Sequence, residues 1–373
     1  MKKRSGIAVA ALGLGCAVLL SGCGGCASCN GSNKNIADFS SNWYANTAYK
    51  KIQPTFTLGN EAGFSSEKLT YTVSFDGSRA TNKSYQVNYA PGVYSTEFYA
   101  AAFDKEAYAH ADFKSGYPEA APVVYCYKTL LDIKEVTFIM GEETRSFTGD
   151  KVETLSFFLS VQDRLQPLYT YTKIKSTTPA ELQVNSIDSA YRQIDCEYTS
   201  YYSYDGNNAI TLIKNGSEEK TRTLSGLENA ENSVVDAAYL DIAARATKLN
   251  GNFSQTLSVN TPARGLQSFT LSGSSSTLTD EEKPAVKSLL EKNGLYNPPL
   301  DAEGKEADFV TAVSVNFNGE QSGVSQTYYF AAIANPRNNS GRATMLKQTA
   351  PLSFGLGTLN YTLNDIESTL WNK

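Results

Sequence analysis

Histidine is nearly absent from this chain, which has one, His110, among 373 residues. A metal site built on two imidazoles, such as the His-Glu-x-x-His motif, is therefore excluded. Basic residues are also too few to outnumber acidic ones, because 33 Lys and Arg stand against 38 Asp and Glu. A chain with excess negative charge lacks the cationic surface that meets phosphates, so we expect no nucleic-acid partner.

Catalytic motifs are missing as well. The sequence contains neither the Gly-x-Ser-x-Gly elbow of hydrolases nor a Walker-type phosphate loop. Ser65-x-x-Lys68 and Ser217-x-x-Lys220 match one part of the penicillin-type acylation signature, but its Ser-Asp-Asn and Lys-Thr-Gly parts are absent. We therefore expect a protein that is not an enzyme and that holds no metal or other cofactor.

Long apolar runs are missing too, and the one sustained run belongs to an export signal. Lys2-Lys3-Arg4 precedes the 14-residue run Ile7–Leu20, which is shorter than the roughly 20 residues of a membrane-spanning helix. The following Leu20-Ser21-Gly22-Cys23 resembles the lipobox of bacterial lipoproteins, in which the Cys thiol receives a diacylglyceryl group. The alternative is a plain secretory signal cut at a small-residue site.

The lipobox resemblance predicts where the mature protein lies. Residues 1–22 would be a signal peptide, and Cys23 would attach the chain to the extracytoplasmic side of a bacterial cell membrane. The mature chain would then carry 30 basic and 38 acidic residues. Residues 23–35 are rich in Gly, Ser and Asn, which is typical of a flexible tether. Cys26 and Cys29 repeat at ligand-like spacing, but a fourth ligand is missing, and we interpret them as accessory thiols.

Most of the remaining chain alternates apolar and polar residues with the period of a half-buried strand. Leu69, Tyr71, Val73 and Phe75 are the first such series, and Asp-Gly or Asn-Gly turns separate several of the later ones. The pattern recurs at residues 85–89, 168–175, 182–187, 196–204, 209–214, 220–224, 309–317, 324–333 and 353–363. It predicts an antiparallel meander with one packed face.

Four segments have helical spacing instead. Val152, Leu155, Phe158 and Leu159 follow Asp150, which with Glu153 forms a capping-box pattern. The other helices are expected at residues 235–249, 280–293 and, more weakly, 36–51. Because no linker separates two halves, we predict a single strand-rich domain over residues 36–373. Its fold class is α+β, mostly antiparallel β, with a curved sheet or half-open barrel that wraps a few helices.

Several short motifs occur in an order typical of a known family. They are Leu69-Thr70-Tyr71-Thr72-Val73-Ser74-Phe75, Leu165-Gln166-Pro167-Leu168, Asp236-Ala237-Ala238-Tyr239-Leu240 with Arg245, Thr327-Tyr328-Tyr329-Phe330 before Arg337, and Gly355-x-Gly357-Thr358-Leu359. Together they resemble a family of uncharacterised bacterial envelope proteins with lipoprotein-carrier-like architecture. The resemblance implies a half-open antiparallel barrel with a helix-lined apolar cleft and no catalytic residues.

Two further sets of residues are candidates for special roles. Cys126 and Cys196 are the cysteines of the folded part, and they form either a disulfide or two buried thiols. Tyr198, Tyr202 and Tyr204 share one face of a predicted strand and are candidate ligand-contact aromatics, or else ordinary strand residues.

Two functions are compatible with these observations. The first is a non-catalytic, membrane-anchored binding or carrier protein whose apolar cleft takes a lipid-like or other amphipathic ligand. The second is a cell-wall glycan-binding or glycan-processing lipoprotein that uses exposed tyrosines and carboxylates, with Glu142-Glu143 as one acidic pair. A deep aliphatic cleft would favour the first, and an exposed tyrosine beside acidic residues would favour the second.

Overall fold

A computed structural model of the chain describes residues 66–161, 164–179, 191–227, 234–247, 254–262, 264–318, 325–332, 344–352 and 355–368. Within them, fifteen strands form one large sheet in the order β11-β10-β9-β8-β7-β4-β3-β1-β18-β17-β16-β15-β14-β13-β12. All neighbours in this sheet are antiparallel except β12 and β13, which are parallel. The fold is therefore mostly antiparallel β, as the sequence predicted.

The strands of the large sheet fall into two runs along the chain. The first run is β1 (Ser66–Asp76), β3 (Gly92–Ala102), β4 (Val123–Ile133), β7 (Lys151–Val161), β8 (Arg164–Pro179), β9 (Tyr191–Tyr202), β10 (Asn208–Asn215) and β11 (Glu218–Ser225). The second run is β12 (Val234–Asp236), β13 (Ser254–Thr261), β14 (Gly265–Ser274), β15 (Val310–Phe317), β16 (Ser325–Ala331), β17 (Met345–Pro351) and β18 (Thr358–Ser368). The pairing of β1 with β18 joins the two runs.

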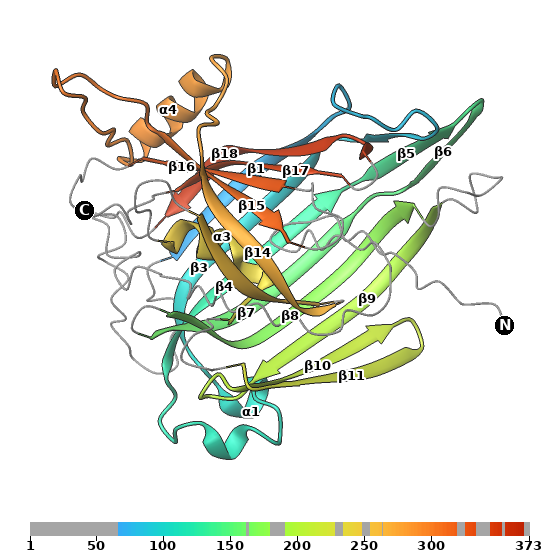
Figure 1. Cartoon of the computed structure of the whole chain (residues 1–373), viewed down its shortest axis with the longest axis vertical. Helices are drawn as coiled ribbons and strands as arrows, with labels where there is room; N and C mark the ends of the chain where they lie inside the picture. The colour runs from blue at the N-terminus through green and yellow to red at the C-terminus, as the bar shows by residue number, and fades with distance from the viewer. Residues whose placement is uncertain are drawn as a thin grey trace.

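The large sheet is strongly curved and is not closed. In Figure 1 the arm made of β14–β16 lies in front of the arm made of β3, β4 and β7, with α3 (Leu240–Ala246) between them. The sheet ends at β11 and β12, and no ladder pairs these two strands in the described residues. We call the side that faces α3 the concave face and the opposite side the outer face.

The remaining strands form a small sheet in the order β2-β5-β6, from β2 (Gln86–Tyr89), β5 (Glu135–Met140) and β6 (Glu143–Thr148). It continues the β4–β7 hairpin, because β5 follows β4 and β6 precedes β7 after a bend. Gly149 lies at this bend, and a Cβ there would lie 1.8 Å from the Ile133 carbonyl oxygen. Val87, Val136 and Phe138 are buried, so the small sheet covers part of the main core.

Helices are short and few in the described residues. They are α1 (Lys105–Tyr108), α3 and α4 (Glu282–Lys292), with 3-10 turns η2 (Lys114–Gly116) and η3 (Ala237–Tyr239). The helices predicted at residues 235–249 and 280–293 are confirmed as the shorter η3–α3 and α4. Every residue of η3 and α3 is buried, since this segment fills the space between the two arms of the sheet.

The helix predicted from Val152, Leu155, Phe158 and Leu159 is wrong, because these residues lie in strand β7. Val152 and Phe158 face the concave core, whereas Leu155 and Leu159 pack on a second cluster on the outer face. When both faces of a strand are covered, apolar and polar residues no longer alternate along it. In β7 the apolar residues therefore fall at a spacing that resembles that of a helix.

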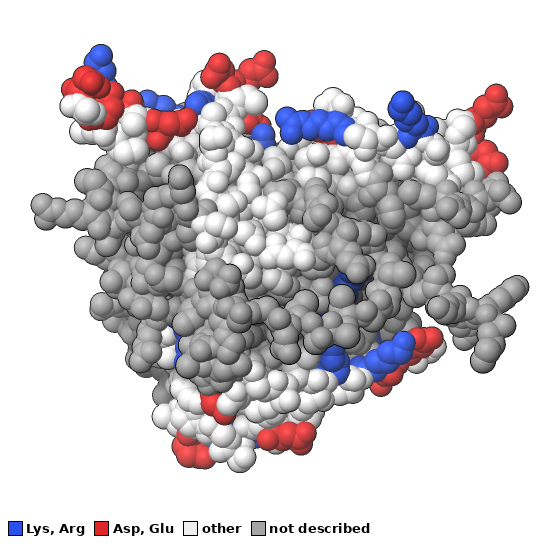
Figure 2. Space-filling model, in the orientation of Figure 1, with Lys and Arg blue, Asp and Glu red and all other residues white. Residues whose placement is uncertain are grey.

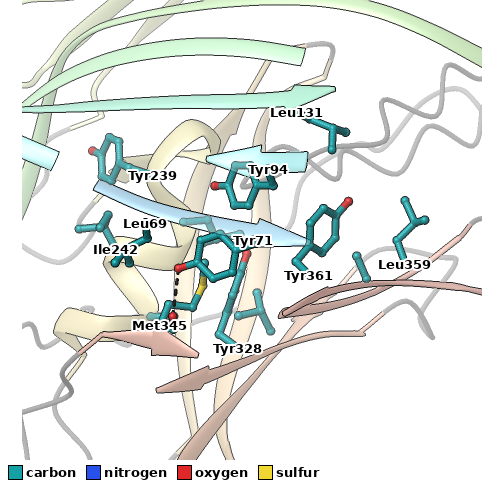
Figure 3. Packing of buried hydrophobic residues seen from close by; sticks show 14 of the residues in the cluster. Leu69, Tyr71, Tyr94, Leu131, Tyr239, Ile242, Tyr328, Met345, Leu359 and Tyr361 are labelled. Atoms are coloured by element: carbon teal, nitrogen blue, oxygen red, sulfur yellow. Dashed lines mark hydrogen bonds between the residues drawn. The ribbon is translucent and has the colours of Figure 1, made fainter. Parts of the chain in front are cut away.

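Tyrosine rings make up much of the main core. Tyr71 stacks on Tyr94 with ring centroids 5.3 Å apart, and Tyr94 meets Tyr361 edge-on at 5.7 Å. Figure 3 shows these rings close to one another, with Tyr71 donating a 3.0 Å hydrogen bond to the Met345 carbonyl. Ile242 of α3 belongs to the same cluster, so the helix and both arms share one core.

The hairpins predicted at Asp205-Gly206 and Asn215-Gly216 are confirmed, and both glycines have positive φ. The last strand is β18, which begins at Thr358 rather than near residue 353. The signal segment, the tether, the helix at 36–51 and the strand at 182–187 lie outside the described residues.

Candidate functional site

The candidate disulfide is not formed. Cys126 on β4 and Cys196 on β9 are both buried, and no disulfide joins them. Cys126 belongs to the outer cluster with Phe157 and Leu168, whereas Cys196 belongs to the main core on the concave side. Two cysteines on opposite faces of one sheet cannot meet without a change in the backbone.

The three candidate tyrosines do not form an exposed platform. Tyr198 and Tyr202 share the concave face of β9, but Tyr198 is 6% exposed and Tyr202 is fully buried. Tyr204 follows the strand and packs against Tyr117, which belongs to the outer cluster. The prediction of a shared face is thus correct for two of the three residues, and that face is interior.

A groove of about 370 Å³ crosses the outer face of the large sheet. Its walls are two rows of side chains that the strand register aligns. One row is Ser95 on β3, Leu130 on β4 and Glu153 on β7. The other row is Lys68 on β1, Glu97 on β3, Lys128 on β4, Leu155 on β7 and Tyr171 on β8.

The floor of the groove follows from the alternation of a strand. Thr96, Thr129 and Thr154 lie between the two rows, and their side chains are buried on the other face. They are direct partners on neighbouring strands, and the hydroxyls of Thr129 and Thr154 are hydrogen-bonded to each other. Alternate residues of a strand are about 7 Å apart, and strands are about 4.8 Å apart. The groove is therefore narrow and runs perpendicular to the strands.

Charges on the groove walls are balanced. Lys68 donates a 2.7 Å hydrogen bond to Glu367 of β18, an interaction that raises the pKa of Lys68. Lys128 lies 4.0 Å from Glu97 and 5.0 Å above the ring of Tyr99. Each sign is thus met by its opposite, and the groove presents hydrogen-bonding groups without net charge.

The middle of the groove is apolar. Leu130 is 37% exposed, which makes it one of the few large exposed hydrophobic residues among those described. Leu155 stands diagonally across the groove from it, next to Tyr171 on the neighbouring strand. Burial raises the pKa of the Tyr171 hydroxyl, which is protonated at neutral pH even at its ordinary value. An apolar centre between hydrogen-bonding ends is the pattern of an amphipathic site.

A different polar cluster is buried on the concave face. Arg245 of α3 donates a 3.1 Å hydrogen bond to Glu67 of β1, and Tyr127 of β4 donates one to Asp241 of α3. Burial, and secondarily the nearby Asp241, raise the pKa of Glu67 to about 8. Burial also raises the pKa of Asp241 to about 6 and lowers that of Arg245 to about 9. The two hydrogen bonds connect α3 to β1 and β4, and each of these four side chains is at most 5% exposed.

Side chains also connect the two ends of the open sheet. Tyr202 of β9 donates a 2.5 Å hydrogen bond to Asp236 of β12 and accepts one of 2.6 Å from Asn260 of β13. Arg222 of β11 donates to the carbonyl oxygen of Thr261 at 3.0 Å. The ends are therefore held together by side chains where a closed barrel would have a backbone ladder.

Comparison with known proteins finds a weak structural likeness. The chain is similar to the crystal structure of a β-barrel-like protein of Domain of Unknown Function DUF1849 from Brucella abortus. The two share 10% sequence identity with a TM-score of 0.40, over 82% of this chain and 98% of that one. No protein-family model and no curated protein matches the sequence.

The described residues contain no helix long and apolar enough to cross a membrane. No three His, Cys, Asp or Glu side chains gather there as a metal site requires. His110 is half-buried just after α1, where its ring lies 5.5 Å from that of Tyr201. Glu142 and Glu143 are exposed at the turn between β5 and β6.

Sequence reasoning missed the groove and the buried charges. The groove combines residues of five strands, and their alignment depends on register, which one sequence does not specify. Glu67 had a weak signal, since it alternates in phase with Leu69 and Tyr71 and so lies on the buried face of β1.

Proposed function

We propose that this protein is a non-catalytic binding protein of the bacterial cell envelope and that the outer groove holds an amphipathic ligand. The observation that carries the proposal is the apolar centre at Leu130 and Leu155, bounded on the walls by paired charges. A volume of about 370 Å³ lies within the usual range of small-ligand sites.

We propose the outer groove as the ligand site, and not the helix-lined cleft on the concave face that the sequence resemblance implied. In the described residues, η3 and α3 occupy the space between the two arms of the sheet, and all their side chains are buried. The groove is open on the outer face, so a ligand could enter without displacing a packed helix. A carrier function would need that ligand to be released again, which suits an open site.

The predicted lipid anchor would place the groove close to a membrane. A lipid on Cys23 with the tether of residues 23–35 would hold the domain near the outer surface of a bacterial membrane. Amphipathic molecules of the envelope would then be the ligands within reach.

Calorimetric titration would test the proposal on the predicted mature chain, residues 23–373, carrying Cys23→Ser, which lacks both the acylation site and the apolar run Ile7–Leu20. The probes are lysophosphatidylcholine below its micellar concentration and neutral linear oligosaccharides. We expect saturable binding of at least one probe, weakened about tenfold or more by Leu130→Asp. Leu266→Asp is the matched control, because Leu266 is 40% exposed on β14, a strand that contributes no residue to the groove. Binding of no probe, or equal binding by both variants, would contradict the proposal.

A further inference from the structure

The walls of the groove also restrict the chemistry of its ligand. We propose that the ligand is an uncharged carbohydrate chain that lies across strands β3, β4, β7 and β8. This inference rests on the proposed function, since it names the ligand class of the same site.

The first argument is the composition of the walls. Four of the side chains that form them are charged, namely Lys68, Glu97, Lys128 and Glu153. An acyl chain is stabilised by about 0.8 kcal/mol per CH₂ only where water is removed from both sides of it. A shallow groove with two leucines and four charged side chains cannot do this for more than a short segment. Sugar hydroxyls, in contrast, accept from ammonium groups and donate to carboxylates along their whole length.

The second argument is charge balance. Lys68 is paired with Glu367, Lys128 with Glu97, and Glu153 with Lys151 at 2.8 Å. The walls carry two Lys and two Glu, so they offer no net electrostatic attraction to an anionic or a cationic ligand. A neutral ligand can hydrogen-bond to the same groups while the pairs stay intact.

The third argument is the aromatic residue at the end of the apolar centre. Tyr171 is a half-exposed wall residue beside Leu155, and it keeps its proton. A tyrosine ring offers an apolar face for the C–H face of a sugar and a hydroxyl for its edge. The row of Lys128, Leu155 and Tyr171 thus supplies a cation, an aliphatic surface and a ring on successive strands.

The shape of the groove fits a chain more than a single small molecule. It runs across neighbouring strands, each step being about 4.8 Å, so four strands give about 14 Å of continuous floor. Thr96, Thr129 and Thr154 keep that floor level because their side chains point to the concave face. A linear oligosaccharide of several units would occupy the whole length.

The test compares two ligand classes on the same Cys23→Ser chain of residues 23–373. The carbohydrate probes are chitohexaose, cellohexaose and maltohexaose, and the lipid probe is lysophosphatidylcholine. We expect at least one hexasaccharide to bind, with an affinity that changes less than threefold between 50 mM and 500 mM salt, because no net charge is involved. Its monosaccharide, which covers only part of the floor of about 14 Å, should bind more weakly.

Substitution of Tyr171 tests whether the hexasaccharide binds in the groove or elsewhere on the protein. Tyr171→Ala should weaken hexasaccharide binding about tenfold or more, and Tyr171→Phe should restore most of it. Tyr296→Ala is the control, because Tyr296 is a partly buried tyrosine that follows α4 and does not line the groove. Circular dichroism would verify that each variant is folded.

The possible outcomes distinguish the carbohydrate inference from the proposed binding function on which it rests. Lysophosphatidylcholine binding that Leu130→Asp weakens, without hexasaccharide binding, would overturn the inference and leave the binding function standing. Hexasaccharide binding that Tyr171→Ala does not affect would also overturn it. Binding of neither class would contradict both.

Discussion

Glu67 is a buried carboxyl group, although the residues next to it in the sequence give little sign of this. It stands in a Ser-x-x-Lys pattern with half-exposed Lys68 beside it, yet only 2% of its own surface is exposed. The alternation of β1 turns it to the concave face, where it meets Arg245 and Asp241. Two carboxyl groups and one guanidinium share this buried site, so one carboxyl retains a proton near neutral pH.

This arrangement predicts how stability depends on pH. The folded-state pKa values of Asp241, at about 6, and Glu67, at about 8, both exceed those of the unfolded chain. The folded state therefore binds more protons, and the free energy of unfolding should fall as pH rises from 5 to 8. Each carboxyl contributes at most about 1.4 kcal/mol per pH unit. Urea unfolding at a series of pH values measures the slope.

Glu67→Gln is the informative variant for that slope. It keeps a polar group beside Arg245 but cannot ionise, so we expect the decline between pH 7 and 8 to become shallower. Glu153→Gln serves as the control, because Glu153 lies on the outer face and has no buried environment to lose. Identical slopes for wild type and Glu67→Gln would show that Glu67 is not the group that titrates.

At the scale of single elements, β7 shows why strand prediction fails where both faces of a sheet are covered. Asp150 and Glu153 read as a capping box, but Asp150 is buried and accepts a 2.9 Å hydrogen bond from Ser176 of β8. The α1 region covers the outer face at Phe157, so β7 buries apolar residues on both sides there. In contrast, β10 and β11 have one exposed face, and their pattern and turns were sufficient to predict them.

The bend between the two sheets gives a sharp prediction. Gly149 is buried, and its backbone donates a 2.9 Å hydrogen bond to the Lys134 carbonyl. A methyl group there would overlap the Ile133 carbonyl oxygen, so the hairpin would have to shift. We expect Gly149→Ala to destabilise the fold by about 2–4 kcal/mol.

Gly116→Ala is the matched control, because a Cβ at Gly116 would have no neighbour within 4 Å. We expect it to change the free energy of unfolding by less than about 0.5 kcal/mol. Urea titrations of the two variants provide the comparison. Equal midpoints would mean that the bend tolerates a side chain and that the close approach is not needed.

At the scale of the whole molecule, the sequence was sufficient for the fold class and insufficient for the site. The antiparallel meander follows from local alternation and turns, which each segment carries by itself. The groove depends on which residues of β3, β4, β7 and β8 stand opposite one another. A shift of one residue in any of these pairings would send its wall side chains to the other face. Figure 2 likewise shows basic and acidic side chains interspersed at the margins of one face, a distribution that net charge does not specify.

We predict that residues 36–373 unfold as one cooperative unit. The pairing of β1 with β18 and the hydrogen bonds of Tyr202 with Asp236 and Asn260 connect distant parts of the chain. Limited proteolysis should remove the N-terminal tether and leave a single resistant core. Two separately stable fragments would contradict the single-domain prediction.

Attachment to the membrane is predicted from the lipobox alone. Replacement of Cys23 by Ser removes the thiol that would be acylated, so cells fed labelled fatty acid should label the wild-type protein and not this variant. Cys29→Ser is the control, because it lies in the same tether outside the lipobox. Equal labelling of the wild-type protein and of Cys23→Ser would mean that the lipid is not attached to this residue.

The central claim is that the outer groove is the ligand site, and mapping by amide chemical shifts tests it most directly. A protein labelled with ¹⁵N and ²H would be titrated with the tightest-binding probe. We predict that the largest shifts cluster at the amides of Ser95, Leu130, Leu155 and Tyr171, while the amide of Leu266 on β14 stays unchanged. Shifts concentrated on α3 and the concave face, with the groove amides unaffected, would contradict the account.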